Sequence, residues 1–231
     1  MLPFDLLYLL IIVPIGIAWW ARSVVTRTFT RYSQVPNRNG LTGLEVAGHL
    51  LQYRELVGVT IGQVPGPYTD NYDPRTDTLN LSETVMNERS VAAMGVVAHE
   101  VGHAVQDLRG YPLMHVRTVL AGWLGWVALL SPFFFIGGLV IGSIILIGLG
   151  ALMLGAFAIF ALITLPVELN ASSRALTMLE ETELAEPEER KEIGSVLRAA
   201  AFTYLASFSQ RLGIFLFFVF IFLALQGIGP F

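Results

Sequence analysis

The sequence has no cysteine and very little charge. The absence of cysteine among its 231 residues excludes disulfide bonds, thiolate metal ligands and cysteine nucleophiles. Charged residues make up only 14% and hydrophobic residues 54%, whereas ordinary soluble domains carry about 25% charged residues. Mean hydropathy is +0.63, so the polar side chains are too few to cover one water-soluble domain. The net charge of −4 gives no support to nucleic-acid binding, and no nucleic-acid partner is expected.

The apolar residues are concentrated in three long stretches. Residues 2–21 contain a single charge, Asp5, and residues 118–166 and 212–231 contain none. A helix needs about 20 apolar residues to cross a bilayer, so the middle stretch is long enough for two crossings and must fold back near Gly137 to Ser143. The sequence therefore predicts transmembrane helices at residues 2–21, 118–138, 143–166 and 210–230. The first has no basic n-region and no small-residue cleavage site, which favours an uncleaved anchor over a signal peptide.

The basic residues predict the orientation. All 14 lie in two polar segments, nine within residues 22–117 and five within residues 167–211. The positive-inside rule then places both polar segments in the cytoplasm and both termini outside. Because the predicted number of spans is even, the two polar segments share one face of the membrane whichever face that is.

The polar segments have patterns of short helices and strands. Thr42 and Glu45 form a capping-box pattern at the start of a helix that is expected to reach about Leu56. Strands are predicted at residues 59–64 and 78–81, with a turn at residues 73–76, followed by a helix at residues 90–108. The third span is expected to continue as a helix over residues 167–179. An acidic linker and a further helix from about Glu188 complete the segment at residues 167–209.

The strongest motif is His99-Glu100-Val101-Gly102-His103, an H-E-x-x-H sequence. On a helix, residues four apart share a face, so both imidazoles can bind one metal ion. Glu100 is then placed to act as general base toward a water molecule. The alternative is that both histidines have a purely structural role in a buried helix, but histidine is uncommon on an apolar helix face.

A catalytic zinc site has three protein ligands and one open position. The metzincin pattern fails, because Gln106 and Arg109 stand where it requires glycine and histidine. Glu168 is favoured as the third ligand, because a carboxylate so near the end of a membrane span is costly unless it is paired or binds a metal. The alternatives are His49, His115 and Asp107.

These motifs resemble known metallopeptidases. The helix containing His99, Glu100 and His103, followed by Glu168 on a later helix, resembles the gluzincins, and residues 99–107 are similar to the active-site helix of thermolysin. The stretch at residues 168–172 resembles the third-ligand helix of the HtpX and CAAX-prenyl endopeptidases, with Ser172 where that family has aspartate. Over nearly its full length, the chain resembles the YugP-type neutral zinc metallopeptidases. The matching stretches are residues 41–43, 72–76, 81–83, 98–104, 165–168 and 170–176.

The resemblance implies a multi-pass zinc peptidase of the bacterial cell membrane. The expected fold is an α-helical integral membrane protein with about four transmembrane helices and a small α+β gluzincin-like domain, with the catalytic domain at residues 22–117. The expected cofactor is Zn²⁺, held by His99, His103 and Glu168, with Glu100 as base. The resemblance also implies that residues 78–82 bind an extended peptide as an edge strand.

Several points stay open at this stage. Glu168 follows the apolar end of the third span by about two residues, so the substrates are expected to be peptides or membrane proteins at the bilayer surface. A partner membrane protein is conceivable, and none is identified. The competing hypotheses are a membrane scaffold with a structural metal site and a zinc hydrolase of a non-peptide bond. Asp107 is a candidate to orient a histidine ligand, and the candidates for an oxyanion donor, none of them assigned, are Tyr72, Arg174, Arg198 and Tyr204.

Overall fold

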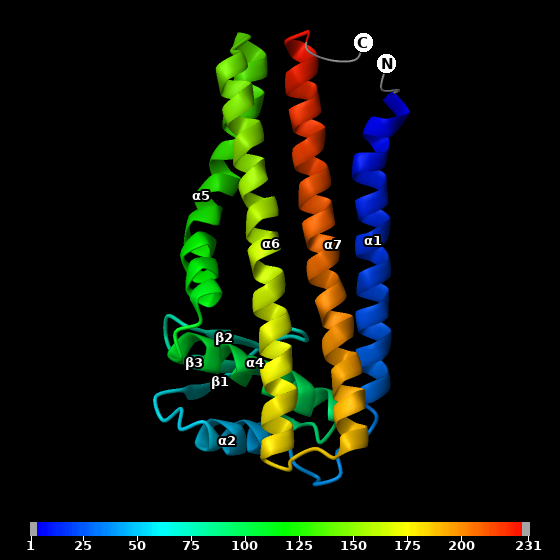
Figure 1. Cartoon of the computed structure of the whole chain (residues 1–231), viewed down its shortest axis with the longest axis vertical. Coiled ribbons are helices and arrows are strands. Elements are labelled where there is room, and N and C mark those ends of the chain that lie inside the picture. Colours follow the sequence, from blue (N-terminus) through cyan, green and yellow to red (C-terminus); the bar gives the residue numbers. More distant parts are fainter. Residues whose placement is uncertain (1–3, 228–231) are drawn as a thin grey trace. The chain divides into compact units, whose positions relative to one another are not determined.

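A computed structural model describes residues 4–227, with side chains described from Tyr8 onward (Figure 1). Residues 2–3 of the first predicted span and residues 228–230 of the last lie outside the described residues. The described elements are α1 (Phe4–Tyr32), α2 (Gly43–Tyr53), β1 (Thr60–Val64), β2 (Asn71–Asp73), β3 (Thr78–Ser82), α3 (Glu83–Asn87), α4 (Val91–Leu108), α5 (Pro112–Ile141), α6 (Ile144–Glu181) and α7 (Pro187–Leu225).

The chain divides into two compact units. The first, here called the apolar unit, comprises residues up to Arg22 together with residues 116–165 and 202 onward. The second, here called the polar unit, comprises residues 23–115 and 166–201. The apolar unit begins again at Phe202 on α7, eight residues before the predicted start of the last span.

Four helices are long and apolar enough to cross a membrane, as the sequence predicts. They are Tyr8–Tyr32, Pro112–Ile141, Ile144–Glu181 and Pro187–Leu225. The middle apolar stretch reverses between α5 and α6, at Gly142, whose φ of 70° is left-handed and readily adopted by glycine. The fold-back predicted near Gly137 to Ser143 is thereby confirmed.

Glycines let the helices of the apolar unit approach one another closely. A Cβ atom on Gly150 of α6 would lie 2.6 Å from the backbone nitrogen of Phe135 on α5. A Cβ atom on Gly213 of α7 would overlap the carbonyl oxygen of Leu10 on α1. Small residues at such contacts allow extensive van der Waals packing where no hydrophobic driving force operates between helices. These glycines therefore serve packing within one bundle.

The polar unit contains a three-stranded sheet in the order β1-β3-β2. β1 pairs with β3 in parallel, and β2 pairs with β3 antiparallel. The sequence predicts β1 and β3, but it does not reveal the three-residue β2. Because β3 is the middle strand, the expectation that residues 78–82 form a peptide-binding edge is wrong. The backbone of β3 is already paired with β1 along its full length and with β2 at residues 78–80.

Two helices of the polar unit begin at well-formed caps. The Glu45 backbone N–H donates to Thr42 Oγ1 at 3.2 Å, and the Thr42 N–H donates to the Glu45 carboxylate at 2.7 Å, which confirms the capping box of α2. α2 ends at Tyr53 and not near Leu56, because Glu55 adopts a left-handed φ of 57°. Ser90 caps α4 by accepting from the Ala93 N–H at 3.1 Å.

The hydrophobic core of the polar unit surrounds α4. Its fully buried members include Leu50 of α2, Leu79 and Leu81 of β3, Met94 and Val97 of α4, and Met178, Leu179 and Ile193 of the later helices. α6 continues as one helix to Glu181, and α7 begins at Pro187, so the acidic linker forms the turn between them. The segments near residues 43–105 and 166–197 therefore share one core, although they are far apart in the sequence.

Candidate metal centre

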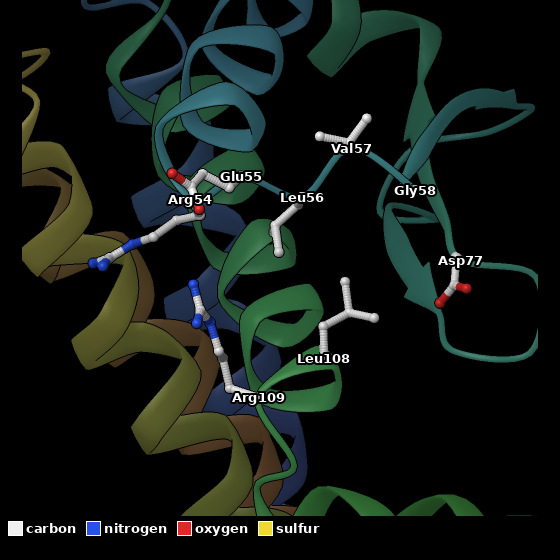
Figure 2. A pocket seen from close by; sticks show the side chains of 8 residues that line it. All are labelled: Arg54, Glu55, Leu56, Val57, Gly58, Asp77, Leu108 and Arg109. Carbon is white, nitrogen blue, oxygen red and sulfur yellow. The ribbon is translucent and has the colours of Figure 1, made fainter.

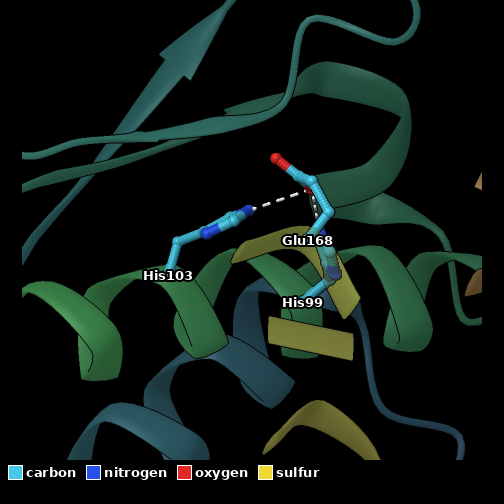
Figure 3. Close-up of side chains that lie close together, drawn as sticks. All are labelled: His99, His103 and Glu168. Atoms are coloured by element: carbon cyan, nitrogen blue, oxygen red, sulfur yellow. Dashed lines mark hydrogen bonds and ion pairs between the residues drawn. The ribbon is translucent and has the colours of Figure 1, made fainter. Parts of the chain in front are cut away.

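α4 presents the two histidines of the H-E-x-x-H motif on one face, as the helical spacing requires (Figure 3). The imidazole rings of His99 and His103 have centroids 4.7 Å apart and are nearly perpendicular, at 83°. His103 is buried, with 5% of its surface exposed. Both side chains direct Nε2 toward the carboxylate of Glu168.

Glu168 comes from α6, 65 residues further along the chain, and is 1% exposed. Its Oε2 lies 3.0 Å from His99 Nε2 and 3.3 Å from His103 Nε2. Gly102 allows this approach of α6 to α4, because a Cβ atom there would lie 2.7 Å from the carbonyl oxygen of Ala171. The fourth position of the motif, the second x, thus has a structural requirement of its own.

The three side chains fit a zinc ion. Their ligand atoms all lie within 4.8 Å of one another. Donor atoms held 2.0–2.2 Å from one tetrahedral zinc ion lie about 3.3 Å apart, which matches the two separations between the histidines and Glu168. Two imidazoles and one carboxylate are also the ligand chemistry of open catalytic zinc sites.

The protonation states suit metal binding. Burial tends to raise the pKa of the Glu168 carboxyl, but hydrogen bonds from His103 and His99 and the charges of both rings outweigh burial, so its pKa lies far below the usual value. Glu168 is therefore anionic and can donate an electron pair to a metal ion. His99 and His103 must each carry their proton on Nδ1 if Nε2 is to bind a metal.

Gln106, which is fully buried, sets the tautomer of His103. Its Nε2 donates to the carbonyl oxygen of Val167 at 2.8 Å and to Asn170 Oδ1 at 3.0 Å, so its Oε1 faces His103 Nδ1 at 2.9 Å. Because Oε1 can only accept, Nδ1 must be the donor, which in a neutral His103 ring leaves the lone pair on Nε2. The sequence does not reveal this role, although Gln106 lies three residues after His103, on the same helical face.

Ser172 is the hydrogen-bond partner of His99 Nδ1. Its Oγ lies 3.2 Å from His99 Nδ1, so a serine occupies the hydrogen-bonding position where the resembling family has aspartate. Asp107, the candidate orienting residue from the sequence, instead lies 3.2 Å from the Tyr72 hydroxyl, whose single proton has a shorter contact with Asp77 at 2.8 Å. The structure therefore assigns the contacts to Nδ1 of the two histidines to Gln106 and Ser172.

Glu100 lies beside the three candidate ligands, next to β2. Its Oε2 accepts a hydrogen bond from the Tyr72 backbone N–H at 3.0 Å. Burial raises the pKa of Glu100, and the charge of Glu168 adds to this; His99 and the Tyr72 N–H oppose it, and the resulting pKa is about 7. A carboxyl with such a pKa can both accept and release a proton near neutral pH.

The remaining candidates for a third ligand lie elsewhere. His49 and His115 are exposed on α2 and α5. Within the described residues, the group of side chains able to hold a metal ion contains only His99, His103 and Glu168.

The candidates for an oxyanion donor have other partners. The Tyr72 hydroxyl donates to Asp77 at 2.8 Å, and burial raises its pKa well above the ordinary value. Arg174 donates to Asn170 Oδ1 at 2.7 Å, and Arg198 donates to Ser195. Tyr204 belongs to the apolar unit. Arg174 thus supports the network that reaches His103 through Asn170 and Gln106.

A separate cleft of about 400 Å³ opens on the polar unit (Figure 2). It is formed by the segment after α2, the end of α4 and Asp77, and it includes the exposed side chains of Val57 and Leu108. None of its lining residues is a candidate metal ligand or Glu100. The cleft is therefore distinct from the candidate metal centre.

Comparison with known proteins agrees with this site. The chain belongs to the family described as "Putative neutral zinc metallopeptidase", whose model matches residues 7–223. It is 39% identical over 214 residues to "Putative membrane protease YugP" of Bacillus subtilis (strain 168), which covers 93% of this chain and 95% of that protein. No solved structure matches the chain. The family predicted from the motifs is confirmed, and the membrane helices agree with the name of the relative.

Proposed function

We propose that this protein is a zinc-dependent endopeptidase that hydrolyses peptide bonds of membrane or membrane-proximal proteins. The observation that carries the proposal is the convergence of His99, His103 and Glu168 beside the partly buried Glu100. Family membership supports zinc as the metal and peptides as the substrate class.

Each residue has a separate task in this proposal. His99, His103 and Glu168 hold the zinc ion, which when bound supplies the Lewis acidity that activates water for attack on an amide carbonyl. Glu100, which lies beside the candidate ligands, takes the proton from the attacking water and delivers it to the leaving amine. Gln106 and Ser172 keep the imidazoles oriented with Nε2 toward the metal position.

The position of Glu168 along α6 supports substrates at the bilayer surface. Glu168 lies within α6, three residues after Leu165, the last α6 residue of the apolar unit. A substrate bond near the bilayer surface would therefore be within reach of the site. The relative from Bacillus subtilis is described as a membrane protease, which agrees with a peptidase located in the membrane.

The decisive experiment compares Glu100→Gln with the wild-type protein, purified and loaded with zinc. We expect Glu100→Gln to retain one zinc ion and lose about 10²- to 10⁴-fold in cleavage rate, the contribution of a general base. Glu55→Gln is the matched control, because it makes the same change at an exposed position in the separate cleft. Equal cleavage by the wild-type protein and Glu100→Gln would refute the mechanism.

The same preparation separates the competing hypotheses. A structural metal site in a scaffold protein predicts bound zinc and no cleavage of any peptide. A hydrolase of a non-peptide bond predicts that peptides stay intact while an ester or lipid substrate is cleaved in a manner that depends on Glu100. The presence of Glu100 beside the candidate ligands favours the catalytic alternatives, because a structural site has no use for a base.

The proposed orientation places the polar unit in the cytoplasm and the α5–α6 turn outside. Because the chain has no cysteine, single cysteines can report it without background. We expect a membrane-impermeant maleimide to label Ser143→Cys, in the α5–α6 turn, on intact cells. Val57→Cys, at a position that is 96% exposed in the polar unit, should be labelled only after permeabilisation. The reverse pattern would invert the orientation.

A further inference from the structure

The apolar unit contains a cation, Arg211, for which the described side chains of the unit supply no acidic partner. Arg211 of α7 is partly buried. Its Nε donates to Ser207 Oγ at 3.2 Å, and its guanidinium carbon lies 5.3 Å from the ring centre of Phe157 on α6. The sequence of the apolar unit has one acidic residue, Asp5, and no described carboxylate side chain belongs to this unit. The contacts of Arg211 are thus polar and aromatic but do not neutralise its charge.

Contacts between α6 and α7 show how deep Arg211 lies. The two helices run antiparallel, because Gly155 contacts Phe215 and Gly148 contacts Phe222. Arg211 lies over Phe157, which precedes Leu165, the last α6 residue of the apolar unit, by eight residues, or about 12 Å of helix rise. The α6 residues 144–165 rise about 33 Å in total, close to the thickness of a hydrocarbon core. Arg211 therefore lies within the apolar unit, although the sequence alone counts it at the end of the polar segment 167–211.

A small cavity lies beside this cation. It has a volume of about 150 Å³ and is lined by Leu154 and Phe157 of α6 and by Arg211 and Ile214 of α7. The surface of the cavity is almost entirely apolar, and the guanidinium of Arg211 lies beside it over the Phe157 ring. A ligand that matches both the cavity and the charge must be an amphiphilic anion.

We infer that Arg211 and this cavity form a binding site for an anionic phospholipid. The phosphate of the lipid would pair with the guanidinium, and a part of one acyl chain would cover Leu154, Phe157 and Ile214. Ser207 lies one turn toward the N-terminal end of α7, so its contact directs Nε toward the end of the span that continues into the polar unit. Phospholipid phosphates are the anions that a bilayer supplies at that end, and basic pockets between membrane helices bind such head groups.

Charge complementarity favours an anionic phospholipid as the ligand of this site. A cation inside the apolar layer is costly unless it is paired or reaches the interface, and a lipid phosphate can meet it without any acidic residue of the chain. The inference does not depend on the peptidase chemistry, because it concerns only residues of the apolar unit. An acidic group of a transmembrane substrate is the competing occupant, and the experiment distinguishes it.

The test uses the full-length protein in nanodiscs of phosphatidylglycerol and phosphatidylcholine in equal parts. Native mass spectrometry after release counts the lipids that stay bound. We expect wild-type protein to retain phosphatidylglycerol in preference to phosphatidylcholine. Arg211→Gln should lower this retention by about fivefold or more, the factor that one cation near a membrane surface contributes. Arg211→Lys, which keeps the charge but loses the planar contact with Phe157, should retain an intermediate amount.

Arg22→Gln is the matched control, since it removes an exposed arginine of the same unit outside the cavity, and it should leave retention unchanged. Ile214→Trp keeps the charge but fills the cavity, so it should also lower the retention of phosphatidylglycerol. This variant tests the lipid site if Arg211→Gln does not fold. Equal retention by wild-type protein and both cavity variants would overturn the inference. So would an equal loss in Arg22→Gln. An effect of Arg211→Gln on cleavage of membrane substrates, with lipid retention unchanged, would assign the site to a substrate instead.

Discussion

The polar unit surrounds its buried charges with partner side chains, whereas the apolar unit has almost no charge to bury. Glu168, which is 1% exposed, contacts two histidines. Gln106 is fully buried, and both polar atoms of its side chain form hydrogen bonds within the polar unit. The apolar unit instead relies on glycines that let helices approach. The difference shows that chemistry in this chain requires fixed polar partners, while the membrane helices require only close contact.

The largest effect is expected from Glu168→Ala, which removes one of the three candidate zinc ligands. Zinc affinity should fall by more than about 100-fold, beyond the 10- to 100-fold typical of a residue that only supports a ligand. Isothermal titration with zinc measures this. Glu180→Ala, on the same helix, removes an ion pair with Arg190 in which the carboxylate is 65% exposed, and it should leave zinc affinity unchanged. Full zinc binding by Glu168→Ala would move the third ligand elsewhere.

A smaller effect is expected from Gln106→Ala, which removes the acceptor for His103 Nδ1. Without it the imidazole can rotate or change tautomer, so zinc affinity should fall by about 10- to 100-fold. Nitrogen NMR of the imidazoles should show that Nδ1 of His103 is protonated in the wild-type protein but not uniformly in the variant. Gln52→Ala, at an exposed position of α2, serves as control. If affinity and tautomer both stayed as in the wild-type protein, Gln106 would have only a packing role.

Gly102→Ala tests the close approach of α6 to α4. The added Cβ would lie 2.7 Å from the Ala171 carbonyl oxygen, so α6 must shift, at a cost of about 1–3 kcal/mol in the free energy of unfolding. The shift also moves Glu168, so zinc affinity should fall while both histidines remain. Gly48→Ala makes the same change on α2, where nothing lies within 4 Å, and should be neutral or stabilising by up to about 1 kcal/mol. Equal behaviour of the two variants would contradict the contact.

The smallest effect on the metal centre is expected from a change in the apolar unit. Gly150→Ala places a Cβ atom 2.6 Å from the Phe135 backbone and should lower the thermal midpoint by separating α5 from α6. Zinc affinity of the folded protein should stay as in the wild-type protein. Gly122→Ala, where no atom lies within 4 Å, controls for the change itself. Loss of zinc affinity in folded Gly150→Ala would contradict the contrast between the two units, because it would show that helix packing in the apolar unit affects the metal ligands.

Much of the fold is predictable because it follows from local patterns. The capping box at Thr42 predicts α2, residue composition predicts α4, and the length of the charge-free run predicts the reversal near Gly142. β2 is not predictable in this way, because three residues show no periodicity. The order of the strands is also not visible in local patterns. The peptide-binding edge at residues 78–82 is implied only by the resemblance to gluzincins, whereas β3 is the middle strand.

The sequence by itself determined the four apolar helices, the metal-binding motif on α4 and the family to which the chain belongs, because each depends on residue types at short spacings. Only the tertiary structure decided which groups surround that motif. It brought Glu168 to the histidines, assigned Gln106 and Ser172 to their Nδ1 atoms, and set Arg211 against Phe157 inside the apolar unit. The physical reason is that these contacts join residues on different helices or select one hydrogen-bond partner among several, and both depend on how the helices pack.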